Sequence, residues 1–93
     1  MELTQLSCEE FLSQLASKAA APGGGGAAAL VGAAGAALGN MVGSLTTGKK
    51  KYAAVEADIQ ALNARAEALR HRLEALVQAD ADGIAQSKAV HFF

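Results

Sequence analysis

The sequence predicts an all-α protein: a helical bundle with a short N-terminal helix, a Gly/Ala-rich buried helix and a long amphipathic helix. Three observations support this prediction. A capping motif precedes an apolar stretch near the start of the chain, and residues 27–46 contain neither charge nor proline. From residue 52 to 76, apolar side chains recur every three or four positions, which is the spacing of one face of a helix.

The size of the chain limits its core, and its charge limits its partners. The 93 residues are enough for a single domain, 1–93, and a chain of this size buries only about 60% of its unfolded surface. The net charge of −1 argues against a general attraction to nucleic acid. The single cysteine, Cys8, allows no internal disulfide, and Glu2 does not fit the basic start of a signal peptide. We therefore expect a cytoplasmic protein.

The first helix is expected to begin after Ser7. Ser7 and Glu10 have the spacing of a capping box, in which each side chain bonds the backbone N–H of the other residue. Its apolar positions are Cys8, Phe11, Leu12, Leu15 and Ala19. Because Cys8 lies in this apolar set without a basic neighbour, a structural role is favoured over that of a nucleophile.

The second helix is expected to follow a glycine loop. Proline and four consecutive glycines favour a loop over 22–26, and Ala27–Thr46 would then form a helix about 30 Å long. Gly35, Gly39 and Gly43 recur at every fourth position. Each glycine costs a helix about 1 kcal/mol relative to alanine. Close approach by neighbouring helices would compensate for that cost.

Two nucleotide-binding patterns occur in this region, and neither has its usual context. Gly23, Gly25 and Ala28 fit the loose dinucleotide pattern, which requires a preceding strand where this chain has helical periodicity. The run from Gly43 to Lys49 spells most of a phosphate loop. Lys50 stands where that loop needs a Ser or Thr for magnesium, so both nucleotide interpretations are disfavoured.

A membrane span is a further alternative for residues 27–46. The length fits, and Lys49–Lys51 would be a basic anchor. However, Asn40, Ser44 and the glycines oppose insertion into lipid. We therefore expect a helix that packs against protein and no membrane partner.

The glycine segment and the lysine turn each allow a structural and a binding interpretation. Glycine amides at the start of a helix can receive an anionic or carbonyl group, or they can simply form a tight corner. Lys49–Lys51 complement the negative end of the helix dipole, but three lysines exceed what capping requires.

The third helix is expected to carry a heptad seam that stops at a carboxylate. The seam consists of Tyr52, Val55, Ile59, Leu62, Ala66, Leu69, Leu73 and Leu76. Its next positions are Asp80 and Gly83. Either the helix frays there, or Asp80 or Asp82 lines a pocket as a general acid or base. The charges of this helix, and His71 between two arginines, are expected to face solvent. Arg70 and Glu74 have the spacing of an ion pair on one helix.

The C-terminal residues carry apolar side chains without a partner in the expected bundle. Ile84, Val90, Phe92 and Phe93 have little charge around them, so we expect a homo-oligomer to cover them. The two histidines and one cysteine lack the spacing of metal ligands, and no metal is expected.

Three motifs in this chain resemble the cyclodeaminase/cyclohydrolase family of folate enzymes. They are the PGGG-to-Leu segment at 22–30, the M-V-x-x-L-T helix end at 41–46 and the G-K-K-K-Y turn at 48–52. A weaker likeness extends upstream to Phe11 and downstream to Asp82. Family domains are about twice as long, so the chain resembles the N-terminal half.

The resemblance implies cyclodeamination of formiminotetrahydrofolate or hydrolysis of methenyltetrahydrofolate. It implies a folate, which could carry a polyglutamate tail, as substrate and no further cofactor. The substrate-binding residues would be Pro22, Gly23, Gly24, Gly25, Gly26, Lys49, Lys50, Lys51 and Tyr52, and the catalytic residues Asp80 and Asp82. The lysines would meet the glutamate tail, and Tyr52 would meet a ring. The alternative is a non-catalytic oligomerisation module or an inactive half-domain.

Overall fold

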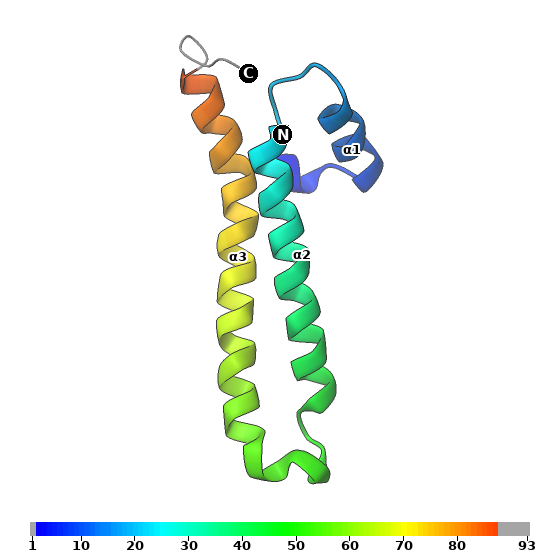
Figure 1. Cartoon of the computed structure of the whole chain (residues 1–93), viewed down its shortest axis with the longest axis vertical. Coiled ribbons are helices and arrows are strands. Elements are labelled where there is room, and N and C mark those ends of the chain that lie inside the picture. Colours follow the sequence, from blue (N-terminus) through cyan, green and yellow to red (C-terminus); the bar gives the residue numbers. More distant parts are fainter. Residues whose placement is uncertain (1, 88–93) are drawn as a thin grey trace.

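The computed structural model describes residues 2–87, and those residues form an antiparallel helical hairpin with a short helix at one end (Figure 1). The elements are the 3₁₀ helix η1 (Leu3–Gln5), α1 (Cys8–Ala16), α2 (Gly23–Thr46), the 3₁₀ helix η2 (Lys50–Val55) and α3 (Glu56–Ser87). The long helices α2 and α3 lie side by side along their length, and α1 lies beside the start of α2. The all-α prediction is therefore confirmed.

Helix α1 begins with the predicted capping box. The Glu10 amide donates to the Ser7 hydroxyl oxygen at 3.1 Å, and the Ser7 amide donates to a Glu10 carboxylate oxygen at 3.2 Å. Phe11, which was predicted to lie on the apolar face of this helix, is buried. Cys8 does not lie on the buried face of α1, because it is exposed; its structural role stays a prediction. Cys8 is the first helical residue, and no other element covers that end of α1.

The capping box makes the stability of α1 depend on pH. Hydrogen bonds from the Ser7 side chain and amide lower the pKa of Glu10 below its ordinary 4.5. A lowered pKa in the folded state stabilises α1 at pH values above 4.5, and this contribution disappears as pH falls through the folded pKa. We expect Ser7→Ala to destabilise α1 by about 1 kcal/mol at pH 7 and to flatten this dependence. Amide exchange of α1 measured from pH 7 to 3 tests this; an unchanged pH dependence in the variant would contradict it.

Helix α2 begins four residues earlier than predicted. Pro22 is its N-cap and Gly23, at φ 66°, its first residue, so the glycines form the first turn of the helix instead of a loop. The reason is tertiary. A Cβ on Gly26 would lie 3.3 Å from Pro22 and 3.7 Å from the Val77 carbonyl of α3. Close contact with α3 therefore favours helical glycines over an open loop. The end of α2 at Thr46 agrees with the sequence prediction.

The prediction that the Gly/Ala-rich helix is buried is wrong within this chain. Its buried residues are Gly26 and Ala33, whereas Leu38 and Leu45 are 59% and 62% exposed. The apolar residues of α2 occur on every side of the helix, whereas α3 covers only one side. By length and composition α2 could cross a membrane, although one such helix is weak evidence for a span.

The prediction of a heptad seam on α3 is confirmed for some of its residues and wrong for others. Ile59, Ala66 and Leu73 are partly covered, but Leu62, Leu69 and Leu76 are between 46% and 59% exposed. The face toward α2 is rotated so that it includes Asn63 and Val77. The helix does not fray at Asp80, since it continues to Ser87.

The core lies at the end of the hairpin that carries α1. Leu3, Phe11, Val77 and Ala81 form the buried cluster, and Leu6, Leu15, Ala21 and Ala29 pack against it. The Leu3 amide also donates to the Gln78 side-chain oxygen at 2.9 Å. This core fixes the start of α2 against the last turns of α3. The apolar C-terminal side chains that were expected to contact another subunit lie outside the described residues. Only the backbone of α3 is described there, as far as Ser87.

Candidate functional site

The carboxylate of Asp80 lies against the glycine turn that begins α2. A Cβ built on Gly25 would be 2.6 Å from Asp80 Oδ1 and 2.7 Å from Oδ2, so a larger residue at position 25 would have to displace this carboxylate. The Asp80 Oδ2 atom is buried and has no hydrogen-bond partner in the described part of the chain. The first-turn amides of α2 have no acceptor within their own helix. This end of the hairpin therefore brings a carboxylate oxygen without a described hydrogen-bond partner against the first turn of α2.

The sequence proposed two aspartates, and the structure separates them. Asp82 is exposed and its Oδ1 accepts a hydrogen bond from the Gln78 side chain at 3.1 Å. Two residues along a helix differ by about 200° in direction, so Asp82 cannot face the glycine turn when Asp80 does. Pro22 is fully buried beside the turn, after a cis peptide bond. It supports the turn and offers no exposed surface to a ligand.

The lysine turn lies at the other end of the hairpin, where Lys49 precedes η2 and Lys50 and Lys51 begin it. Lys49, Lys50 and Lys51 are all exposed, and the Lys51 Nζ atom lies 5.5 Å from the centre of the Tyr52 ring. Gly48 turns the chain with φ 81°, and its amide donates to a Glu56 carboxylate oxygen at 2.8 Å. A small hollow of about 320 Å³ lies among Gly48, Lys49, Lys50, Ala53 and Glu56. The three lysines are thus available to an anion.

The two proposed binding segments do not meet within one chain. Gly25 and Lys49 are separated by the length of α2, about 36 Å at 1.5 Å per residue. Figure 1 shows the glycine turn and the lysine turn at opposite ends of the hairpin. The structure therefore joins Asp80 to the glycines and leaves the lysines and Tyr52 apart from them.

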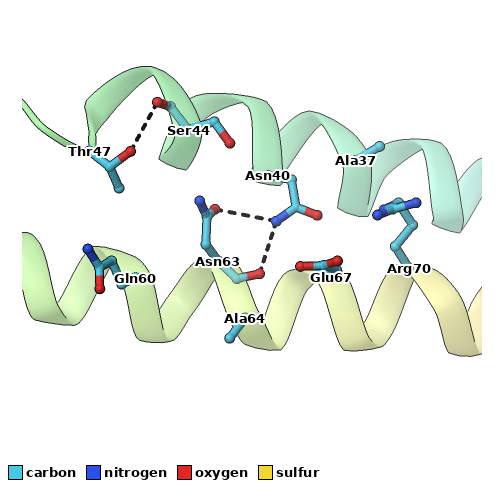
Figure 2. A pocket seen from close by; sticks show the side chains of 9 residues that line it. All are labelled: Ala37, Asn40, Ser44, Thr47, Gln60, Asn63, Ala64, Glu67 and Arg70. Atoms are coloured by element: carbon cyan, nitrogen blue, oxygen red, sulfur yellow. Dashed lines mark hydrogen bonds between the residues drawn. The ribbon is translucent and has the colours of Figure 1, made fainter.

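A polar groove between these two ends was not predicted as a site. Figure 2 shows its lining, which comes from both long helices: Ala37, Asn40, Ser44, Thr47, Gln60, Asn63, Ala64, Glu67 and Arg70. The groove is open and has a volume of about 680 Å³. Asn40 Nδ2 donates to the Asn63 carbonyl oxygen at 3.0 Å and to Asn63 Oδ1 at 3.3 Å. A partly buried amide pair of this kind can fix the register of two helices.

One signal in the sequence could have revealed this groove. Asn40 is a polar side chain in the middle of the Gly/Ala-rich helix, and its Oδ1 is buried without a hydrogen-bond partner among the described residues. Gly43, one turn later, leaves space for Asn63. On α3, Arg70 pairs with Glu74 at 3.0 Å, as expected from their spacing, and His71 is exposed. The pairing of Asn40 with Asn63 depends on the register of the two helices, which their sequence separation does not give.

The remaining site patterns can be placed in the structure. Residues 43–46 are helical, so the Gly43-to-Lys49 run does not form a phosphate-binding loop. No strand precedes the glycine turn in residues 2–22, as a dinucleotide fold would need. Over the part of the chain that the structure describes, no group of three His, Cys, Asp or Glu side chains is placed to hold a metal ion.

Comparison with known proteins identifies the family. The model of the family described as formiminotransferase-cyclodeaminase matches residues 7–90. A methenyltetrahydrofolate cyclohydrolase of Methylorubrum extorquens is 53% identical over 74 residues, which cover 80% of this chain and 36% of that protein. No solved structure matches the chain significantly. The aligned part thus spans about a third of that relative. Because the family model covers nearly the whole chain, this protein belongs to the formiminotransferase-cyclodeaminase family.

Proposed function

We propose that this chain acts on the one-carbon unit of a reduced folate, with Asp80 as the general acid and base. The observation that carries this proposal is the buried, unpartnered Asp80 Oδ2 atom beside the glycine turn. The relative's name, methenyltetrahydrofolate cyclohydrolase, favours hydrolysis over cyclodeamination. The substrate of this chain would then be methenyltetrahydrofolate.

The hydrolysis removes both protons of the attacking water, delivers one of them to nitrogen and releases the other to solvent. Water attacks the methenyl carbon that bridges two nitrogens, and a new C–O bond forms. The bond from that carbon to one nitrogen then breaks, and the nitrogen must gain a proton. A carboxylate at the position of Asp80 can accept one proton from the attacking water and return it to the departing nitrogen. The second proton leaves the hydroxyl group for solvent as the C=O bond forms. The first-turn amides of α2 would stabilise the negative charge that develops on oxygen.

Cyclodeamination would use the same groups in a different order. A folate nitrogen attacks the formimino carbon, the bond from that carbon to the amino nitrogen breaks, and ammonia leaves after taking up a proton. The carboxylate again transfers the proton. Incubating the chain with each substrate separates the two reactions, because the hydrolase destroys the methenyl chromophore and the deaminase creates it while releasing ammonia.

The alternative is a helical oligomerisation module without activity. One observation favours it: apolar side chains of α2 and α3 are exposed. This alternative predicts a stable oligomer that neither binds nor turns over a reduced folate. Calorimetric titration with a reduced folate decides between the two, since tight, saturable binding is incompatible with a purely structural module.

We also propose that Lys49–Lys51 bind the glutamate tail of the folate. Replacing all three lysines by glutamine should weaken binding of a polyglutamylated folate about tenfold. Three exposed ion pairs contribute roughly 0.2–1 kcal/mol each, and 1.4 kcal/mol corresponds to a factor of ten. Binding of the form with one glutamate should change less. Titrations at low and high salt measure both effects.

Lys18→Gln provides the matched control, because Lys18 is exposed and follows α1, and Figure 1 shows α1 at the opposite end of the hairpin from the lysine turn. Equal affinities for both tail lengths in the triple variant and the native chain would contradict the role of the lysines. That result would leave the role of Asp80 untouched.

A further inference from the structure

The side-chain amide of Gln78 is hydrogen-bonded at both ends. Its carbonyl oxygen accepts from the Leu3 amide at 2.9 Å, and its Nε2 atom donates to Asp82 Oδ1 at 3.1 Å. The bond to Leu3 joins residues 75 positions apart, whereas the bond to Asp82 stays within α3. Because an ionised carboxylate can only accept, Asp82 holds the nitrogen of the amide and leaves its oxygen facing Leu3.

This amide connects the N-terminal segment to the last turns of α3. Leu3 belongs to the buried cluster, and Val77, the neighbour of Gln78 in α3, is fully buried in the same cluster. Apolar contacts of this kind have little directional preference. The hydrogen bond between Leu3 and Gln78 is directional, so it limits how far α3 can rotate about its own axis.

Gln78 and Asp80 lie on nearly opposite sides of α3. They are two residues apart, so they differ by about 200° in direction around the helix axis. The segment η1 therefore contacts α3 on the side of Gln78, and the glycine turn contacts it on the side of Asp80. Any rotation of α3 that moves the Asp80 carboxylate along the glycine turn also moves the Gln78 amide past η1.

A small rotation of α3 is enough to matter at Asp80. Side chains of an α-helix extend about 5–6 Å from its axis, so a rotation of about 10° moves a carboxylate by roughly 1 Å. A displacement of about 1 Å at a reacting group can lower a rate about 100-fold. The same rotation would stretch or bend the 2.9 Å bond from Leu3 and weaken it. The bond therefore opposes the rotations that would displace Asp80.

We propose that Gln78 is a positioning residue for Asp80: its amide, oriented by Asp82, fixes the rotation of α3 that holds the carboxylate against the glycine turn. Gln78 would act through the helix and not on the substrate. The effect on turnover rests on the proposed function of Asp80, whereas the effect on the position of the carboxylate does not. Asp82→Asn keeps an acceptor oxygen for the Gln78 amide and should not disturb it.

Turnover of paired variants tests the positioning role. Gln78→Met removes both hydrogen bonds and keeps an unbranched side chain of similar length, so kcat should fall about tenfold while KM changes less. Combining Gln78→Glu with Asp82→Asn reverses the polarity of the pair, because the asparagine amide donates to one glutamate oxygen and the other oxygen faces Leu3. This double variant should recover kcat to within about twofold of the native value. Native kcat in Gln78→Met, or no recovery in the double variant, would overturn the proposal.

Two controls separate a positional effect from a loss of stability. Gln60 donates to Glu56 at 2.8 Å, and this pair lies at the end of α3 that is near the lysine turn. Gln60→Met removes this similar bond and should retain kcat. Gly43→Ala is expected to destabilise the hairpin, and its folded fraction should also retain kcat. A loss of kcat in Gly43→Ala as large as that in Gln78→Met would show that stability explains both, and would overturn the proposal.

The position of Asp80 can be followed by NMR without any substrate. Asp80→Asn should shift the amide resonance of Gly25 in the native chain, because the carboxylate lies against this residue. In a Gln78→Met background the same change should shift it by about half as much or less. The Leu3 amide should be protected from hydrogen exchange in the native chain and lose that protection in Gln78→Met. Equal shifts in both backgrounds, or a Leu3 amide that exchanges freely in the native chain, would overturn the proposal.

Turnover and NMR test different parts of the proposal. If the native chain turns over no folate, the proposed function fails, and the Gly25 resonance still decides whether Gln78 positions Asp80. If Gln78→Met does not fold, Gln78→Asn gives the same comparison, because its shorter side chain draws the carbonyl oxygen away from Leu3.

Discussion

Asp80→Asn should reduce turnover of methenyltetrahydrofolate about 10²- to 10⁴-fold, which is the usual contribution of a positioned acid or base. Asparagine has nearly the shape of aspartate, so the helix and the folate affinity should be retained. The amide cannot exchange protons with water or with the departing nitrogen. Steady-state kinetics and a binding titration of the same preparation separate the loss of kcat from any loss of affinity.

Asp82→Asn is the matched control on the same helix. Asp82 is exposed and accepts its hydrogen bond from Gln78, away from the glycine turn. Its replacement should leave kcat within about twofold of the native value, as expected of a group outside the site. Equal losses for both aspartates, or a fully active Asp80→Asn variant, would contradict the assignment of Asp80.

The glycine turn offers a second control for this prediction. Gly25→Ala would place a methyl group within 2.6–2.8 Å of the Asp80 carboxylate and must displace it. Gly24→Ala meets no described atom within 4 Å. We therefore expect Gly25→Ala to lower kcat and Gly24→Ala to retain it, even though both changes raise helix propensity. Similar kinetics for the two variants would show that the position of Asp80 does not matter.

Gly43→Ala should destabilise the hairpin by about 1–2 kcal/mol at a site where the same change normally stabilises a helix. The new methyl group would displace the Asn63 side chain and disturb the hydrogen bonds from Asn40. Leaving a buried polar group unsatisfied costs about 1–3 kcal/mol, and the gain in helix propensity offsets about 1 kcal/mol of it. Urea unfolding at one fixed protein concentration measures the difference.

In a double-mutant cycle, the effect of Gly43→Ala on the stability of the hairpin should change sign. Once Asn63→Ala has removed the obstructing side chain, Gly43→Ala should stabilise the hairpin by up to about 1 kcal/mol. The Asn40 amide still has the carbonyl oxygen of residue 63 as an acceptor, at 3.0 Å. If Gly43→Ala stabilises the native background as well, the contact with Asn63 has no energetic weight.

Local patterns determined the parts of the fold that depend on neighbouring residues. The capping box of Ser7 and Glu10 set the start of α1, and the end of the charge-free run set the end of α2. The spacing of Arg70 and Glu74 gave their ion pair. Each of these features depends on residues within about four positions of one another, where the geometry of a single helix fixes the contact.

Contacts between residues far apart in the chain decided the features that these local patterns did not predict. The face of α3 toward α2 differs from the predicted seam: it includes Val77, which is buried, and Asn63, whose side chain occupies the space beside Gly43. The glycines after Pro22 became helical because they contact α3.

The site divides in the same way. The sequence by itself determined the all-α class, the glycine turn, the lysine turn and a pair of candidate carboxylates. Only the tertiary structure decided that Asp80, and not Asp82, faces the glycines, and that the lysines lie at the far end of the hairpin. The physical reason is that helix spacing fixes directions around one axis, whereas the relative rotation and register of two helices depend on contacts between residues far apart in the chain.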